Sequence, residues 1–242
     1  MRTLTQDKVI LHLLDEIETY TGKISLSVMP EDHRALARCT IRYTPEDGWM
    51  LWHIPEVKTS NATLCHELAH LILLFEGWPA FIIDSDLPKS DYLIQTVSML
   101  TNLVLHIEVW RVVKSLGFDE IPDYEPGLHQ LIFAIKSGRL LSGAYTNEIL
   151  PFRAAYIAGG LLCPAKLEIQ KLLRDTASRT MPEALELADS IVRVFERLHP
   201  IDPKSSAEAL SEICERLQIH RGILIASWPD IVDLHFRKRF QI

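Results

Sequence analysis

The chain has 242 residues, of which 48% are hydrophobic and 24% charged, and its formal net charge is −7. This length suits one large domain or two small ones and allows a core that needs no disulfide bonds. The acidic balance argues against a nucleic-acid-binding protein, because phosphate contacts require a basic surface. The four cysteines form no CxxC pair, and the first twenty residues carry charges throughout. No apolar run reaches the roughly 20 residues of a membrane span. We therefore expect a cytoplasmic protein with reduced thiols, no membrane segment and no nucleic-acid partner.

The first sixty residues predict one helix followed by short strands. Apolar residues recur at helical spacing in residues 5–22, which is typical of an amphipathic helix. Alternating apolar and polar residues then predict strands at 23–29, 38–44 and 48–55, and Asp47-Gly48 favours a hairpin between the last two.

The rest of the chain shows helical patterns and no further strand pattern. A long helix is predicted over residues 92–116, and shorter ones over 128–137, 146–162, 164–175, 182–198 and 206–218. The Pro/Asp/Glu-rich stretch 119–127 is the best candidate for a boundary. We therefore predict an α+β fold, with an N-terminal domain of residues 1–118 and an all-helical C-terminal domain of residues 119–242.

Residues 61–77, NATLCHELAHLILLFEG, form an apolar helical segment that contains three polar side chains of chemical interest. Ser60 or Asn61 can cap its beginning, and Gly77 can end it. His66 and His70 are four residues apart, so they lie on one helical face about 6 Å from each other and can bind one ion. The alternative, a helix with His66, Glu67 and His70 on a solvated outer face, leaves the many leucines of this segment unexplained.

The HExxH spacing carries a specific chemistry. A zinc ion held by two histidines and a third ligand keeps one position for water and lowers the pKa of that water to about 7. Glu67 lies beside the two histidines and can take the proton of the water as it attacks a carbonyl, then pass it to the leaving amine.

The segment CHELAH on a helix, preceded by a helix and short strands, resembles the zincin-like metallopeptidases over about 115 residues. The resemblance implies short antiparallel strands, then the HExxH helix, then a second helix that carries a ligand. It also implies that His66 and His70 bind zinc and that Glu67 is the general base. In that fold the strand before the HExxH helix is an edge to which an extended peptide adds, and here this strand would be the segment WMLWHIP, residues 49–55.

The third ligand has three candidates. Metzincins continue as HExxHxxGxxH, but this chain has Leu73 and Glu76 at the last two defining positions. Gluzincins place a glutamate on the next long helix, which here offers His106 and Glu108. Residues two apart on a helix point in nearly opposite directions, so His106 and Glu108 cannot both face the motif. Glu108 falls on a polar stripe that predicts exposure, and His106 falls on an apolar face, so we take His106 as the third ligand and keep Glu108 and Glu76 as alternatives.

We expect a zinc-dependent metallopeptidase that acts on a peptide or protein, with Zn²⁺ bound by His66, His70 and His106. The alternative is a regulatory or binding protein that keeps the zincin-like fold and the metal but cleaves little or nothing. Some small HExxH proteins cleave a transcriptional repressor, so a transcriptional regulator is one class of target under either reading.

Overall fold

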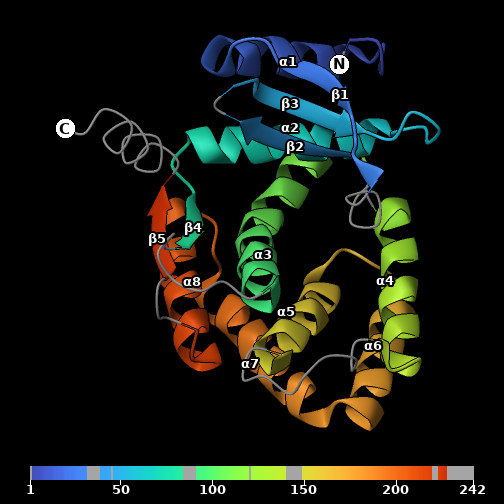
Figure 1. Cartoon of the computed structure of the whole chain (residues 1–242), viewed down its shortest axis with the longest axis vertical. Coiled ribbons are helices and arrows are strands. Elements are labelled where there is room, and N and C mark those ends of the chain that lie inside the picture. Colours follow the sequence, from blue (N-terminus) through green and yellow to red (C-terminus); the bar gives the residue numbers. More distant parts are fainter. Residues whose placement is uncertain are drawn as a thin grey trace. The chain divides into compact units, whose positions relative to one another are not determined.

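A computed structural model describes residues 2–31, 39–44, 46–83, 91–119, 121–139, 149–219 and 223–227. Over these residues the fold is α+β and mostly helical, as predicted, with eight helices and five short strands (Figure 1). The chain divides into two compact units. Unit 1 comprises Met1–Phe75 and Val109–Glu120, and unit 2 comprises Glu76–Glu108 and Ile121–Ile242. Residues 76–108 therefore group with the later helices, whereas the sequence suggested one boundary after residue 118.

Unit 1 contains two helices and a small sheet, in the chain order α1 (Lys8–Thr21), β1 (Ser25–Val28), β2 (Cys39–Thr44), β3 (Gly48–His53) and α2 (Asn61–Phe75). Asp7 caps α1, because its carboxylate accepts hydrogen bonds from the backbone N–H groups of Val9 and Ile10. The buried face of α1 packs against α2, and α2 also packs against β2.

The sheet of unit 1 has the strand order β1-β3-β2 (Figure 1). The hairpin partners β2 and β3 are antiparallel as predicted, but β1 runs parallel to β3, so the expectation of purely antiparallel strands is wrong. The expectation that residues 49–55 form an edge strand is also wrong, because β3 is the central strand. Alternation of side chains marks a strand but not its direction or its neighbours, which depend on the connections. The edge strand that packs on α2 is β2.

Helix α2 begins where the sequence predicts. The Ser60 hydroxyl accepts a hydrogen bond from the backbone N–H of Thr63 at 3.0 Å, as an N-cap does. Gly77, with φ of +86°, follows the end of the helix. About half of α2 is buried, and four of its six half-buried residues are spaced as one helical stripe, namely Thr63, Glu67, His70 and Leu74.

Unit 2 contains β4 (Pro79–Ile83) and five further helices, which are α4 (Ile121–Lys136), α5 (Ile149–Leu162), α6 (Leu167–Thr180), α7 (Pro182–Leu198) and α8 (Pro203–Leu217), followed by β5 (Ile223–Ser227). The expectation of an all-helical C-terminal part is wrong, because β5 pairs antiparallel with β4. The stretch 119–127 is also largely helical, since α4 begins at Ile121 and includes Pro126. Both strands are short apolar runs whose partner lies far away in sequence, so no local pattern reveals them.

Helix α3 (Asp91–Ser115) is unbroken, and it contributes its first part to unit 2 and its last part, from Val109, to unit 1. Its segment Tyr92–Ser115 is long and apolar enough to cross a membrane by length and composition. The core helix of a soluble protein meets the same two criteria, and Leu100, Val104, Val109 and Val113 of α3 are fully or almost fully buried in the fold. The absence of a membrane segment stays a prediction.

Close helix packing in unit 2 depends on Gly160 of α5. A Cβ atom at this position would lie 2.5 Å from Cδ2 of Leu173 on α6 and 3.1 Å from methyl carbons of Leu128 and Leu131 on α4. At the neighbouring Gly159, a Cβ atom would make only ordinary contacts, at 3.4 Å from Sδ of Met99 and 3.6 Å from Cδ2 of Leu103. Two adjacent glycines of one helix therefore have different packing roles.

We expect Gly160→Ala to lower the free energy of unfolding by about 1–3 kcal/mol, because three leucines must move to admit the methyl group. The matched change Gly159→Ala should be neutral or stabilising by up to about 1 kcal/mol, since alanine favours a helix. Urea unfolding followed by circular dichroism measures both. Equal effects of the two substitutions would contradict this packing.

Candidate metal centre

His66 and His70 present their imidazoles to each other from successive turns of α2. Their Nε2 atoms are 3.1 Å apart, and their ring centroids are separated by 4.8 Å. The His66 side chain is buried, with 7% exposure. The i, i+4 spacing on a straight helix places the rings on one face, so the geometry that the sequence predicts is present.

His106 joins this pair from α3. One ring nitrogen from each of His66, His70 and His106 lies within 4.8 Å of the others, which makes a three-histidine group that can hold a metal ion. His106 is three residues from Val109, where α3 belongs to unit 1, so one continuous helix carries the third imidazole and the segment that packs in that unit. We refer to His66, His70 and His106 as the histidine cluster.

The donor set of the histidine cluster fits a transition metal. Two imidazole nitrogens bound tetrahedrally to one zinc ion are about 3.3 Å apart, since each Zn–N bond measures 2.0–2.1 Å. The Nε2 atoms of His66 and His70 are at nearly this separation. The widest spacing within the cluster, up to 4.8 Å, exceeds this separation by at most about 1.5 Å. Three neutral nitrogen donors suit zinc, copper, iron or nickel better than magnesium or calcium, which prefer oxygen.

The protonation state of His70 also suits metal binding. Part of the His70 residue reaches solvent, but desolvation of its ring lowers its pKa well below the usual value for histidine, and the neighbouring His66 lowers the pKa further. His70 is therefore neutral at neutral pH, and a neutral imidazole is the form that binds a metal ion.

The structure separates the three candidates for the third ligand. Glu76 is exposed and follows the end of α2, and it is not part of the histidine cluster. Glu108 is not part of the cluster either, but its side chain is buried with 5% exposure, so the prediction that it lies on a solvated stripe is wrong. Helix α3 is buried on more than one side, and polar residues on such a helix do not mark an exposed face.

Glu67 is anchored by a contact that the sequence does not reveal. Its Oε2 atom accepts a hydrogen bond of 2.9 Å from the backbone N–H of Ile41 in β2. An N–H that reaches a side chain on α2 points away from β3, so this contact lies on the edge of β2 that faces away from β3. The donor is a backbone N–H, which every residue except proline has, so the sequence could not have predicted this hydrogen bond.

Cys39 lies near Glu67 and stays protonated. Burial raises the pKa of its thiol far above the usual value, and the negative charge of Glu67 raises the pKa further. Only a thiolate is a good zinc ligand or nucleophile. Cys39 therefore does not compete with the three histidines.

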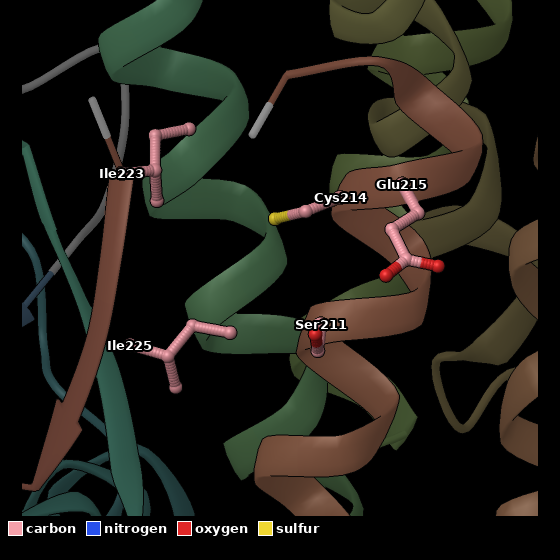
Figure 2. Close-up of a pocket in the computed structure, with 5 residues that line it drawn as sticks. All are labelled: Ser211, Cys214, Glu215, Ile223 and Ile225. Carbon is pink, nitrogen blue, oxygen red and sulfur yellow. The ribbon is translucent and has the colours of Figure 1, made fainter. Parts of the chain in front are cut away.

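A pocket of about 440 Å³ lies elsewhere, between α8 and β5, and is lined by Ser211, Cys214, Glu215, Ile223 and Ile225. Figure 2 shows the two isoleucines projecting from β5 toward α8, with the Cys214 thiol pointing back toward the strand. Burial raises the pKa of this thiol to about 12, so it is a poor nucleophile at neutral pH. The lining residues include no member of the histidine cluster, and the pocket offers no comparable chemistry.

Comparison of the chain with models of known protein families, with curated proteins and with solved structures yields no match. The geometry of the histidine cluster and the chemistry of its residues are therefore the basis for a functional proposal.

We expect the purified protein to bind about one zinc ion per chain, measured by isothermal titration and elemental analysis. His66→Ala, His70→Ala and His106→Ala should each weaken binding by more than the roughly 10–100-fold that loss of an outer partner costs. His129→Ala, at an exposed position of α4, is the control and should bind like wild type. Wild-type affinity in His106→Ala would remove this residue from the ligand set.

Proposed function

We propose that this protein is a zinc-dependent metallopeptidase with a zincin-like arrangement of α1, the three-stranded sheet, α2 and α3. The observation that carries the proposal is the histidine cluster. Glu67 follows His66 directly on the same helix, which completes the HExxH spacing, and its carboxylate accepts the hydrogen bond from Ile41. In hydrolases, a metal site with three imidazole ligands and one open coordination position most often holds zinc.

Glu67 has the position of a general base in this proposal. A bound zinc ion would supply Lewis-acid chemistry, which polarises a carbonyl and lowers the pKa of a water. Glu67 accepts the proton of the attacking water and delivers it to the leaving amine, so one carboxylate serves both halves of hydrolysis. The hydrogen bond from Ile41 fixes the orientation of this carboxylate, which removes part of the entropy cost of proton transfer.

We propose the outer edge of β2 as the place where an extended peptide binds. Among the described strands none pairs with this edge. The backbone N–H of Ile41 points out of it toward Glu67, and alternation along an antiparallel strand directs the backbone groups of Cys39 and Tyr43 the same way. A peptide that adds there would bring one of its amide groups next to Glu67.

A peptide or protein substrate, a cytoplasmic location and the lack of a nucleic-acid partner remain part of the proposal. A transcriptional regulator stays one class of target. The net charge of −7 supports a protein or peptide substrate over a nucleic acid.

Glu67→Gln should retain zinc but reduce peptide hydrolysis by a factor of at least about 100, because the amide cannot accept the proton. A library of internally quenched fluorescent peptides measures activity, and elemental analysis measures zinc. The control is Glu76→Gln, which changes an exposed carboxylate just after α2 and should keep both properties.

Two results would reject the proposal. Wild-type protein without stoichiometric metal would remove the basis of the chemistry, and unchanged hydrolysis in Glu67→Gln would remove Glu67 from its role. Wild-type protein that binds zinc but cleaves no peptide would instead support the regulatory or binding protein that keeps this fold.

A further inference from the structure

Four aromatic rings form a continuous row at one end of unit 1. Tyr20 of α1 stacks on Phe75 of α2 with ring centroids 6.1 Å apart, and Phe75 meets the edge of Trp49 of β3 at 6.1 Å. Trp49 in turn contacts Tyr43 of β2 at 5.1 Å. We call Tyr20, Phe75, Trp49 and Tyr43 the ring row.

The ring row is buried at its centre and open at its ends. Trp49 is 7% exposed, whereas Tyr43 is 46% exposed and Tyr20 is 70% exposed. Single exposed apolar residues are ordinary on protein surfaces, but the exposed Tyr43 ring packs on the buried Trp49 ring, and exposed aromatic surface of this kind can mark a binding site. The buried centre holds the exposed rings in place, so their ordering costs little entropy on binding.

The register of β2 relates the ring row to Glu67. Ile41, whose N–H binds Glu67, precedes Tyr43 by two residues, so the two side chains lie on the same face of the sheet about 7 Å apart. This face is the one toward α2, because the Tyr43 ring contacts Trp49 and Trp49 contacts Phe75 of α2. Tyr43, the member of the ring row on β2, is therefore two residues along the strand from Ile41, whose N–H binds the Glu67 carboxylate.

A peptide strand paired with β2 must follow the same pleat. Its residue opposite Tyr43 directs its side chain to the face of the ring row, and that residue is two positions from the one opposite Ile41. Directly paired side chains in a sheet are about 5 Å apart at Cβ, which is contact distance for a large side chain.

We propose that the ring row is a specificity subsite, with Tyr43 as its main contact, for a large apolar or aromatic side chain two residues from the peptide residue beside Glu67. This inference rests on the proposed binding of peptides at β2. Ring edges and faces favour an aromatic or apolar partner, and the four members of the row bring no formal charge at neutral pH.

The first experiment maps cleavage sites. Ten-residue peptides of alternating alanine and threonine carry a single phenylalanine that is moved from position three to position eight. With zinc-loaded wild-type protein, mass spectrometry should find the cleaved bond at a constant distance from the phenylalanine. Tyr43→Ala should lose this preference and raise KM about fivefold to tenfold with little change in kcat, because the lost contact is the same in ground state and transition state.

The second experiment measures binding without catalysis. Fluorescein-labelled versions of the same peptides are titrated with the Glu67→Gln protein, and polarisation reports affinity. A phenylalanine peptide should bind about fivefold to tenfold more tightly than the all-alanine/threonine peptide, and the double variant with Tyr43→Ala should lose that difference. Tyr43→Phe keeps the ring and should keep the difference. Phe133→Ala removes a ring that is 57% exposed on α4 and should also keep it.

The two experiments separate the subsite from the function. Cleavage of the peptides at sites unrelated to the phenylalanine, or equal affinities with and without it, would overturn the subsite and leave the peptidase intact. Protein that takes up no zinc and cleaves nothing would reject the proposed function, while the affinity difference in the binding experiment would still decide the subsite. A stable Tyr43→Ala protein that retains the wild-type preference for phenylalanine would also overturn the proposed subsite.

Discussion

Two imidazole nitrogens 3.1 Å apart on a largely buried helix impose the main constraint on this molecule. Charging the His70 ring there is unfavourable, because burial penalises the ion and the neighbouring His66 lowers the pKa of His70 further. Two imidazole nitrogens so close can share one hydrogen bond or one cation. The rest of the centre is consistent with the second arrangement, because His106 supplies a third imidazole nitrogen and the Cys39 thiol beside Glu67 is kept protonated.

The centre combines elements with different tasks. Helix α2 fixes the spacing of two histidines and the glutamate by its own geometry, so these positions depend on no distant contact. Strand β2 holds Glu67 through one backbone N–H, and α3 brings the third imidazole. A backbone donor is well suited to this task because it has no side-chain freedom to lose. The same strand also presents Tyr43, so one short strand both orients the carboxylate and carries an exposed member of the ring row.

Local features of the site were predictable from sequence, and contacts between distant segments were not. The face shared by His66 and His70, the Ser60 cap and the rule that His106 and Glu108 cannot both face the motif follow from helical geometry, which depends only on residues a few positions apart. His106 does join the cluster, but the argument that selected it relied on an exposed Glu108, and Glu108 is buried. The burial of Glu108 was missed because a stripe of polar residues predicts an exposed face only on an amphipathic helix, and α3 is buried on several sides. The contact between Ile41 and Glu67 and the parallel direction of β1 involve backbone groups and connections, which leave no mark in the pattern of side chains.

The pairing of β4 with β5 has a consequence for how the chain reaches its fold. Partners in this two-stranded sheet are at least 140 residues apart in sequence, from Ile83 and Ile223 outward. Closing so long a loop is entropically costly and slow compared with forming the helices in between. During synthesis β4 therefore stays without its partner until about 140 further residues have been made, whereas the HExxH helix and the hairpin beside it precede β4 in the chain and need none of those residues. The order of synthesis favours assembly of the histidine pair and its glutamate well before unit 2 is complete.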